Sequence, residues 1–413
     1  MKRGLVLLGL LAVVCILFSR DLTIRRERSQ LRSGPGSYYP VLRELPSQSR
    51  VALLDSLVHW YKVRYQNDQG YLAQSATLAL TRRNDIFSGM QSGGSSSVNR
   101  HSITAGVRGF ADLFCSELQG DTLFINKVLA ETPDPEPFYE MIQKRDREMN
   151  LQRYRAQFPL PPRGFQDYFL EAQEGFGLAL ASVIAQQGLY TDTELNRYIN
   201  EVGNLLVACS DMPDQSFRFF ILDIESANAY SCPGGFVFIS RGMLEFLQNE
   251  AELAFVLAHE IAHVSRFHGI TELRERENQI ASSSAFDELD AALGDRISTS
   301  TRELTASLES EVFEIYNTLI SGRLDAYEEE ADRLALLFMA RATYDYQVSG
   351  ELLNRLLASR IDSNNQHYRK ESLRQRLALL RDSQSGMNRG NLTLYSFEDK
   401  FNTHFSNRGD SDK

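Results

Sequence analysis

His259-Glu260-Ile261-Ala262-His263 has the residue types and the spacing that hydrolytic metal chemistry requires. Residues four positions apart lie on one face of an α-helix, so the two imidazoles can bind the same metal ion. Zn²⁺ accepts nitrogen ligands of this kind, and Glu260 can then take a proton from a metal-bound water. The pattern therefore predicts a zinc site. The alternative is a buried helix whose two histidines have other partners.

The segment that positions this motif is predicted to be a buried helix. Asn249 followed by Glu252 is typical of a helix start. Residues 253–264 are almost all apolar outside the motif, as in a helix that is buried on every side. Because burying two histidines and a glutamate without partners costs free energy, a bound metal ion accounts for their presence.

A third zinc ligand is expected from elsewhere in the chain. The pattern H-E-x-x-H-x-x-G-x-x-H places a third histidine six residues after the second, with a glycine between them. Here His268 follows His263 by five residues, and no glycine stands between them. We therefore interpret His268 as a structural residue and not as a ligand.

The acidic run at 326–332 is the candidate source of that ligand. Glu328 and Asp332 are four residues apart and share one face of a predicted helix, whereas Glu330 points away from that face. Glu328 can complete a His₂Glu site, and Asp332 can accept the second ring N–H of a ligand histidine. The alternative is a solvated acidic face, which the apolar residues at 334–340 disfavour.

With H-E-x-x-H followed by E-x-x-x-D, the chain resembles the gluzincin family that contains the CAAX prenyl proteases and related bacterial envelope peptidases. Residues 228–242 are similar to the strand and turn that precede the zinc helix in that family, and residues 171–206 to its opening helices. The resemblance implies a mainly α (α+β) metallopeptidase domain with a small sheet beside the zinc helix. It also implies one zinc ion per chain, held by His259, His263 and Glu328, with Glu260 as general base.

The predicted sheet is the candidate site for substrate. Short β-rich runs at 217–223 and 236–239 are separated by Asn, Pro and Gly. An exposed edge of such a sheet can bind an extended peptide by strand addition, and a plain structural hairpin is the alternative. The family pattern N-A-x-x-x-P-G-G selects the substrate-strand residues, which are Asn228, Ala229, Gly234 and Gly235.

His367 is a further catalytic candidate that depends on the resemblance alone. The family tends to have a His-Pro pair upstream of an arginine near its end, whereas this chain has His367-Tyr368 before Arg374 and Arg376. His367 is therefore either a group that stabilises the transition state or a histidine of a surface loop.

Residues 272–322 have amphipathic spacing and are predicted to be a helical insertion, which serves as a lid, as a surface for a partner or as a structural element.

An all-β module is predicted before the peptidase. Short β-rich runs at 51–54, 60–65 and 70–72 are separated by turn residues. With its L-R-S-G-P turn at 31–35, the segment resembles the bacterial SH3-like domain, whose members bind cell-wall peptides or proteins. Trp60 and the pair Tyr38–Tyr39 are either a binding platform or the core of a small barrel.

The first residues predict export. Lys2 and Arg3 precede an apolar run at 5–18, typical of a signal sequence, but no clear A-x-A cleavage site follows. The segment is thus either a cleaved signal or a short membrane anchor, and we expect the protein on the periplasmic side of a bacterial envelope. A net charge of −10, with 44 basic and 54 acidic residues, disfavours nucleic-acid binding.

The chain is therefore expected to be multidomain. We expect a signal or anchor at 1–21, the SH3-like domain at 22–79, a Gly/Ser-rich linker at 80–104 and a helical connection at 105–164. The zinc metallopeptidase domain is expected at 165–385 and a polar C-terminal tail at 386–413.

Two functions fit this organisation. One is an endopeptidase that acts on envelope proteins in quality control, and the other is a binding or chaperone-like protein with a structural zinc site. The intact Glu260 favours the enzyme, because a structural site needs no general base.

Overall fold

A computed structural model describes most of the chain. The described residues are 20–26, 29–36, 39–57, 59–77, 121–130, 136–161, 170–213, 215–269, 271, 325–359 and 370–405. The predicted signal up to residue 19, the linker, the insertion at 272–322 and His367 lie outside them. The chain divides into two compact units, one made of Met1–Pro35 and Pro40–Ala79, the other of Gly36–Tyr39 and Leu80–Lys413.

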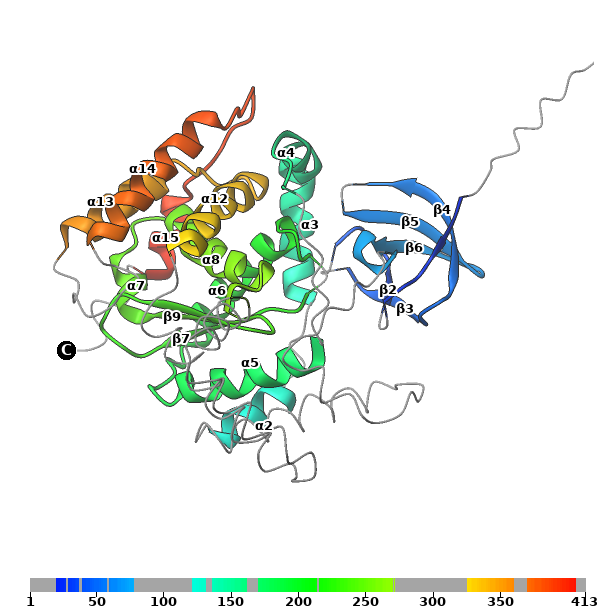
Figure 1. The fold of residues 1–413 in the computed structure, drawn as a ribbon, viewed down its shortest axis with the longest axis horizontal. Helices are drawn as coiled ribbons and strands as arrows, with labels where there is room; N and C mark the ends of the chain where they lie inside the picture. Colours follow the sequence, from blue (N-terminus) through cyan, green and yellow to red (C-terminus); the bar gives the residue numbers. More distant parts are fainter. Residues whose placement is uncertain are drawn as a thin grey trace, which may run out of the picture. The chain divides into compact units, whose positions relative to one another are not determined.

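The N-terminal unit is all-β, as predicted. Its six strands form one antiparallel sheet in the order β1-β4-β5-β6-β2-β3 (Figure 1). Its core includes Ile24, Leu31, Val51 and Val63, all at most 1% exposed. Trp60 is 1% exposed, which agrees with the core interpretation of this residue. The strands are β1 Arg20–Thr23, β2 Ser29–Arg32, β3 Val41–Leu45, β4 Arg50–Ser56, β5 Trp60–Tyr65 and β6 Asp68–Ala73.

The second unit is mainly helical with a small sheet, which confirms the predicted fold class. Its described helices are α2 Thr122–Ala130, α3 Glu136–Met149, α4 Leu151–Gln157, α5 Leu170–Ala185, α6 Thr193–Cys209, α7 Arg241–Phe246, α8 Glu250–Ser265, α12 Asp325–Arg341, α13 Val348–Ala358, α14 Lys370–Gly386 and α15 Glu398–Phe405. Its strands are β7 Arg218–Leu222, β8 Ala229–Cys232 and β9 Phe236–Ser240.

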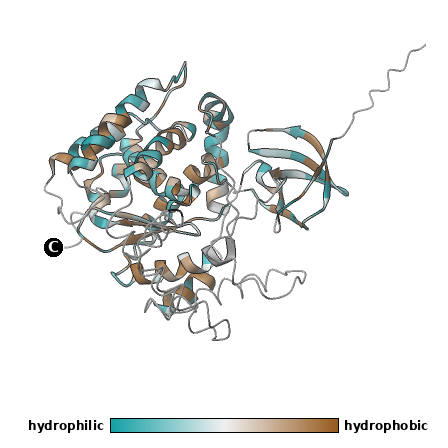
Figure 2. Cartoon of the chain, in the orientation of Figure 1, coloured by the Kyte–Doolittle hydropathy of each residue, from teal (hydrophilic) through white to brown (hydrophobic). Residues whose placement is uncertain are grey.

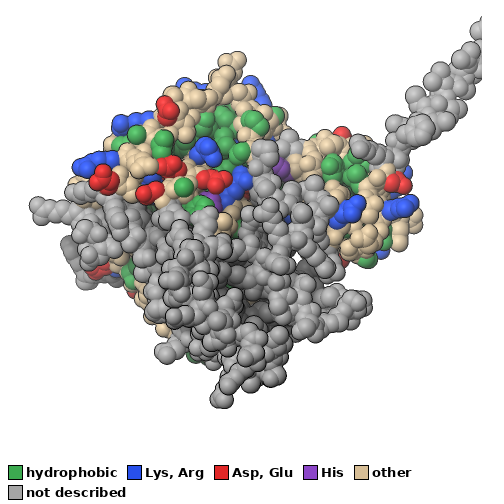
Figure 3. All heavy atoms as spheres, in the orientation of Figure 1, with side chains coloured by type: hydrophobic (Ala, Val, Ile, Leu, Met, Phe, Trp, Pro, Cys, Tyr) green, Lys and Arg blue, Asp and Glu red, His purple; other side chains and the backbone are tan. Residues whose placement is uncertain are grey.

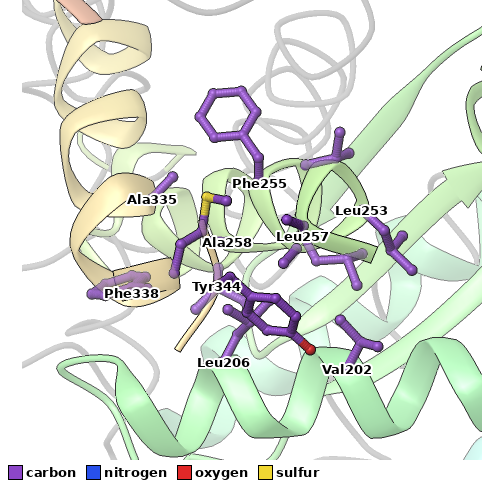
Figure 4. Packing of buried hydrophobic residues seen from close by; sticks show 14 of the residues in the cluster. Val202, Leu206, Leu253, Phe255, Leu257, Ala258, Ala335, Phe338 and Tyr344 are labelled. Atoms are coloured by element: carbon purple, nitrogen blue, oxygen red, sulfur yellow. The ribbon is translucent and has the colours of Figure 1, made fainter. Parts of the chain in front are cut away.

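Helix α8, which carries the H-E-x-x-H motif, lies at the centre of this unit. It begins as predicted, because the side chain of Asn249 accepts a hydrogen bond from the backbone N–H of Glu252. Every residue of α8 is buried. Figure 4 shows Leu253 and Leu257 of α8 beside Val202 and Leu206 of α6, with Phe338 of α12 on another side. Packing on several sides fixes the orientation of α8 and hence of its polar residues.

The three-stranded sheet lies between two groups of helices. Its order is β7-β9-β8, with β9 parallel to β7 and antiparallel to β8. Successive side chains of β9 point to opposite faces of the sheet. Val237 and Ile239 therefore pack in the core with α6 and α8, while Phe236 and Phe238 pack in the core with α2 and α5. The predicted runs at 217–223 and 236–239 match β7 and β9. Strand β8 is the edge that packs against α8.

Two predicted boundaries differ from the packing that is observed. Helix α4, within the predicted connection, contributes Leu151 and Tyr154 to the same core as α8. Helix α15, within the predicted polar tail, contributes Phe401, which is 3% exposed. Both segments are polar on average, and their few apolar residues are enough to bring them into the unit. We therefore propose that the peptidase unit extends from α2 to α15.

The described surface of the helical unit is mixed in charge and in hydropathy. Figure 2 shows hydrophobic residues concentrated in α5, whereas α13 and α14 alternate between hydrophilic and hydrophobic faces. On the face drawn in Figure 3, Lys and Arg side chains are interspersed with Asp and Glu among the described residues. None of the described helices is long and apolar enough to cross a membrane.

Candidate metal centre

Helix α8 supplies three of the predicted site residues. His259, Glu260 and His263 are 7%, 8% and 2% exposed, respectively. The Nε2 atoms of the two histidines lie 3.0 Å apart, so the rings present the same nitrogen to one point. Glu260 follows His259 directly in the same buried turns of the helix. The i and i+4 spacing thus brings the two imidazoles together in the way that the sequence predicts.

Helix α12 adds a carboxylate to this pair. Glu328 is 2% exposed, and its Oε2 lies 3.3 Å from His259 Nε2 while its Oε1 lies 3.3 Å from His263 Nε2. Within the described part of the chain, His259, His263 and Glu328 form the group of His, Cys, Asp and Glu side chains that can hold a metal ion.

The spacing of these donor atoms fits zinc. Nitrogen and oxygen ligands bind tetrahedral zinc at about 2.0–2.1 Å, which places ligand atoms about 3.3 Å from one another. The separation of 3.0 Å between the two Nε2 atoms and those of 3.3 Å from each Nε2 to a different oxygen of Glu328 are close to that edge length. Two imidazoles and one carboxylate are also the donor set of catalytic zinc sites that keep one position for water or substrate. The residues therefore fit the ion.

Asp332 and Arg376 surround the other side of His259. Asp332 Oδ1 lies 2.9 Å from His259 Nδ1. Arg376, from α14, donates to both oxygens of Asp332 at 2.7 and 2.8 Å, and its Nη1 lies 2.9 Å from Glu328 Oε2. With Nδ1–H directed at a carboxylate, the neutral imidazole of His259 has its lone pair on Nε2. Arg376 orients both acids, a role that sequence reasoning does not assign to it.

The charges of this cluster perturb one another. Burial lowers the pKa of His259, but the hydrogen bonds that its ring donates to Asp332 and Glu328, together with their charges, outweigh burial and raise that pKa to about 9 in the absence of a metal ion. Zinc binding at Nε2 therefore has to displace a proton from this ring. Burial raises the pKa of both carboxyls, yet the positive charge of Arg376 and contact with His259 hold them below their ordinary values. Both acids are therefore ionised at neutral pH, as a cation site requires.

His268 lies beside His263 without belonging to the group of three. Its Nδ1 is 2.9 Å from His263 Nδ1, and its Nε2 is 3.3 Å from Glu330 Oε2. The ring stacks on Tyr327 with centroids 4.6 Å apart. His268 thus contacts the ring edge of His263 that faces away from Glu328, in agreement with its interpretation as a residue other than a ligand.

The candidate substrate strand borders α8. Asn228 is 7% exposed and its backbone N–H donates to Ser240 Oγ, while Ala229 begins β8. Gly234 and Gly235 have φ of 82° and 93°, and a Cβ on Gly235 would lie 2.5 Å from the carbonyl oxygen of Ser216. The turn that ends β8 therefore requires glycine. The place of His367 relative to this site stays a prediction, because the residue lies outside those described.

Known proteins share the segment that forms this centre. Residues 193–404, just over half of the chain, match Peptidase family M48. The chain belongs to this family. Residues 28–78 match the bacterial SH3 domain. Family M48 consists of metallopeptidases, so the predicted enzyme class is confirmed. The narrower likeness to CAAX prenyl proteases is not specifically supported.

Named proteases are among the similar proteins. The beta-barrel assembly-enhancing protease of Yersinia pestis is 30% identical over 172 residues, which is 42% of this chain and 35% of the relative. The protein of the same name from Escherichia coli K12 is 29% identical over 175 residues, 41% of this chain and 34% of the relative. A mitochondrial metalloendopeptidase of Schizosaccharomyces pombe is 27% identical over 162 residues, 39% of this chain and 44% of the relative. The chain thus spans about a third of the length of the bacterial relatives that it matches.

Proposed function

We propose that this protein is a zinc-dependent endopeptidase that hydrolyses peptide bonds of bacterial envelope proteins in quality control. The observation that carries the proposal is the convergence of His259, His263 and Glu328 at the spacing of tetrahedral zinc ligands, with Glu260 on the same buried helix. A structural zinc site needs no acid next to its ligands, whereas peptide hydrolysis needs one.

Each residue of the site has a distinct part in this proposal. Zinc, when bound by His259, His263 and Glu328, supplies a Lewis acid for the scissile carbonyl. Glu260 accepts the proton of the attacking water and delivers it to the leaving amine. Asp332 and Arg376 keep His259 and Glu328 in position through the contacts described above. His367 remains a candidate for stabilising the transition state.

The sheet edge gives the proposed substrate a backbone partner. Among the described strands β8 is an edge of the three-stranded sheet, and its four residues are buried where it lies against α8. An extended peptide that adds to β8 would therefore have to displace the groups that cover this edge, and it would then run along the helix that holds Glu260. We propose that Asn228 and Ala229 begin this edge and that Gly234 and Gly235 end it, which suits unfolded segments of protein substrates better than folded ones.

The setting of the reaction is inferred from the relatives and the N-terminus. Two of the bacterial relatives are named for enhancing beta-barrel assembly, and the apolar run at 5–18 is typical of export. We propose that the enzyme works on the periplasmic side of the envelope, with the first residues cleaved or serving as an anchor. The SH3-like domain would bind a cell-wall or protein ligand near the substrate.

The test is zinc analysis and proteolysis with the purified chain. We expect about one zinc per chain and cleavage of an unfolded protein that a chelator abolishes and added zinc restores. Glu260→Gln should retain zinc and lose turnover. Wild-type protein that binds zinc but cleaves no unfolded protein would favour the binding or chaperone-like alternative. A Glu260→Gln variant as active as wild type would show that the general base is misassigned.

A further inference from the structure

A third histidine, His268, and a third carboxylate, that of Glu330, continue outward from His263. His268 Nδ1 lies 2.9 Å from His263 Nδ1, and Glu330 Oε2 lies 3.3 Å from His268 Nε2. His268 is 1% exposed and Glu330 is about a third exposed, so the row leads from the buried centre toward solvent. A contact between two ring nitrogens is a hydrogen bond only if one carries a proton and the other a lone pair.

The carboxylate at the outer end decides where these protons lie. An ionised Glu330 accepts only, so His268 must donate its Nε2–H to it. A neutral His268 then has its lone pair on Nδ1 and accepts the Nδ1–H of His263. This leaves the lone pair of His263 on Nε2, the atom that faces His259 and Glu328. The opposite arrangement would put a proton on His263 Nε2 and block a metal there.

Further contacts hold this row in place. Arg266 Nε lies 3.5 Å from Glu330 Oε1, and Arg266 Nη2 lies 3.1 Å from the buried Asp211. The ring of His268 stacks on Tyr327 of α12. The arrangement parallels that around His259, where an acid accepts from Nδ1 and an arginine binds the acid. Each histidine that faces the metal site is thus linked to an acid–arginine pair. His259 contacts Asp332 of the pair Asp332–Arg376 directly. His263 is linked through His268 to the pair Glu330–Arg266.

We propose that His268 and Glu330 are positioning residues that fix the tautomer and the ring orientation of His263 for zinc binding. The inference rests on the proposed zinc site and adds two residues to it. It also changes the expectation for Glu330, which helix geometry alone directs away from the metal. Outer partners of this kind typically change metal affinity or activity about 10–100-fold.

The test uses the difference between the two amide side chains. The Asn amide oxygen occupies the place of histidine Nδ1, whereas the Gln amide reaches only the place of Nε2. We therefore expect zinc affinity, measured on the full chain by competition with a chelator, to fall about 10–100-fold in His268→Gln and His268→Phe. His268→Asn should retain most of the affinity. Glu330→Leu should lower the zinc affinity. Glu329→Leu, which removes the neighbouring acid, should leave the zinc affinity unchanged.

A second measurement reads the protons directly. The chain has seven histidines, and ¹⁵N-labelled histidine in zinc-loaded protein should show His268 protonated at Nε2 and bare at Nδ1. A His268 that carries its proton on Nδ1, or on both nitrogens, would overturn the proposal even if a variant fails to fold. Unchanged affinity in His268→Gln and Glu330→Leu would also overturn it. Wild-type protein that binds no zinc would instead refute the zinc site itself.

Discussion

At the scale of single residues, the centre depends on which of three adjacent acids faces the histidines. Glu328 contacts both Nε2 atoms at 3.3 Å, whereas Glu329 accepts a hydrogen bond from the exposed Gln375 at 2.7 Å. We expect Glu328→Gln to weaken zinc binding severely, because a neutral amide replaces an ionised ligand. Glu329→Gln should bind zinc like wild type. Metal titration of both variants is the check, and retained zinc in Glu328→Gln would refute the assignment.

Substitution of Arg376 should lower the stability of the helical unit. Its side chain, 6% exposed, compensates the buried charges of Asp332 and Glu328. Removing one partner of a buried charge pair costs about 3–5 kcal/mol, so we expect Arg376→Gln to lower the free energy of unfolding of the zinc-free helical unit by about that amount. Far-UV circular dichroism during denaturant unfolding measures it. Arg374→Gln, an exposed change on the same helix, should stay within about 0.5 kcal/mol of wild type.

The sequence identifies residues whose spacing lies within one helix and misses contacts that need the tertiary fold. His259 and His263, or Glu328 and Asp332, face one way because they are four positions apart. The contacts of Arg376 with Asp332 and of Glu330 with His268 join elements 44 and 62 residues apart. No periodicity connects such positions, so their place at the centre appears only in the folded chain.

At the scale of elements, a buried acid joins the start of α8 to its neighbours. Glu250 is 0% exposed and accepts hydrogen bonds from Tyr198 and Tyr344 at 2.8 Å each. Lys400 of α15 lies 2.7 Å from it and Arg145 of α3 lies 3.5 Å from it. This cluster explains why polar segments on both sides of the predicted peptidase domain belong to the fold. The amphipathic sequences of these segments do not indicate that their basic residues, Arg145 and Lys400, compensate the charge of Glu250.

Glu250 should make the stability of the helical unit depend on pH. Burial raises the pKa of Glu250, but Lys400 and Arg145 outweigh it and hold that pKa below the ordinary 4.5. A depressed pKa contributes stability above the unfolded value that is lost as pH falls through the folded one. We therefore expect Glu250→Gln to be less stable than wild type at neutral pH and the difference to shrink below pH 4.5.

Unfolding of zinc-free protein followed by circular dichroism across that range measures this effect. Glu245→Gln is the matched control, because Glu245 is exposed and pairs with Arg241 on the surface. Its pH dependence should parallel that of wild type. A constant difference between wild type and Glu250→Gln at every pH would contradict the assigned titration.

At the scale of the whole molecule, the chain joins two units with separate cores. The buried core cluster of the N-terminal unit lies between Ile24 and Ala76, and the buried clusters of the second unit begin at Phe124 among the described residues. Composition predicts this division, because the Gly/Ser-rich segment at 88–97 has Met90 as its one apolar residue, which is too few for a core. Of the aromatic residues that could form a binding platform on the SH3-like unit, Trp60 is buried and belongs to the core.

We propose that the two units are energetically independent and that the first directs the peptidase without building its metal centre. The only tryptophan of the chain is Trp60, so its fluorescence reports the N-terminal unit while circular dichroism reports the helices. A chelator should lower the thermal midpoint of the helical transition, because zinc binds its folded state alone, and leave the fluorescence transition in place. Limited proteolysis near 88–97 should release a fragment that keeps its zinc and cleaves a small unfolded substrate. If a chain without residues 22–90 loses its zinc, or if the chelator shifts both transitions together, the units are coupled and the SH3-like domain takes part in forming the centre.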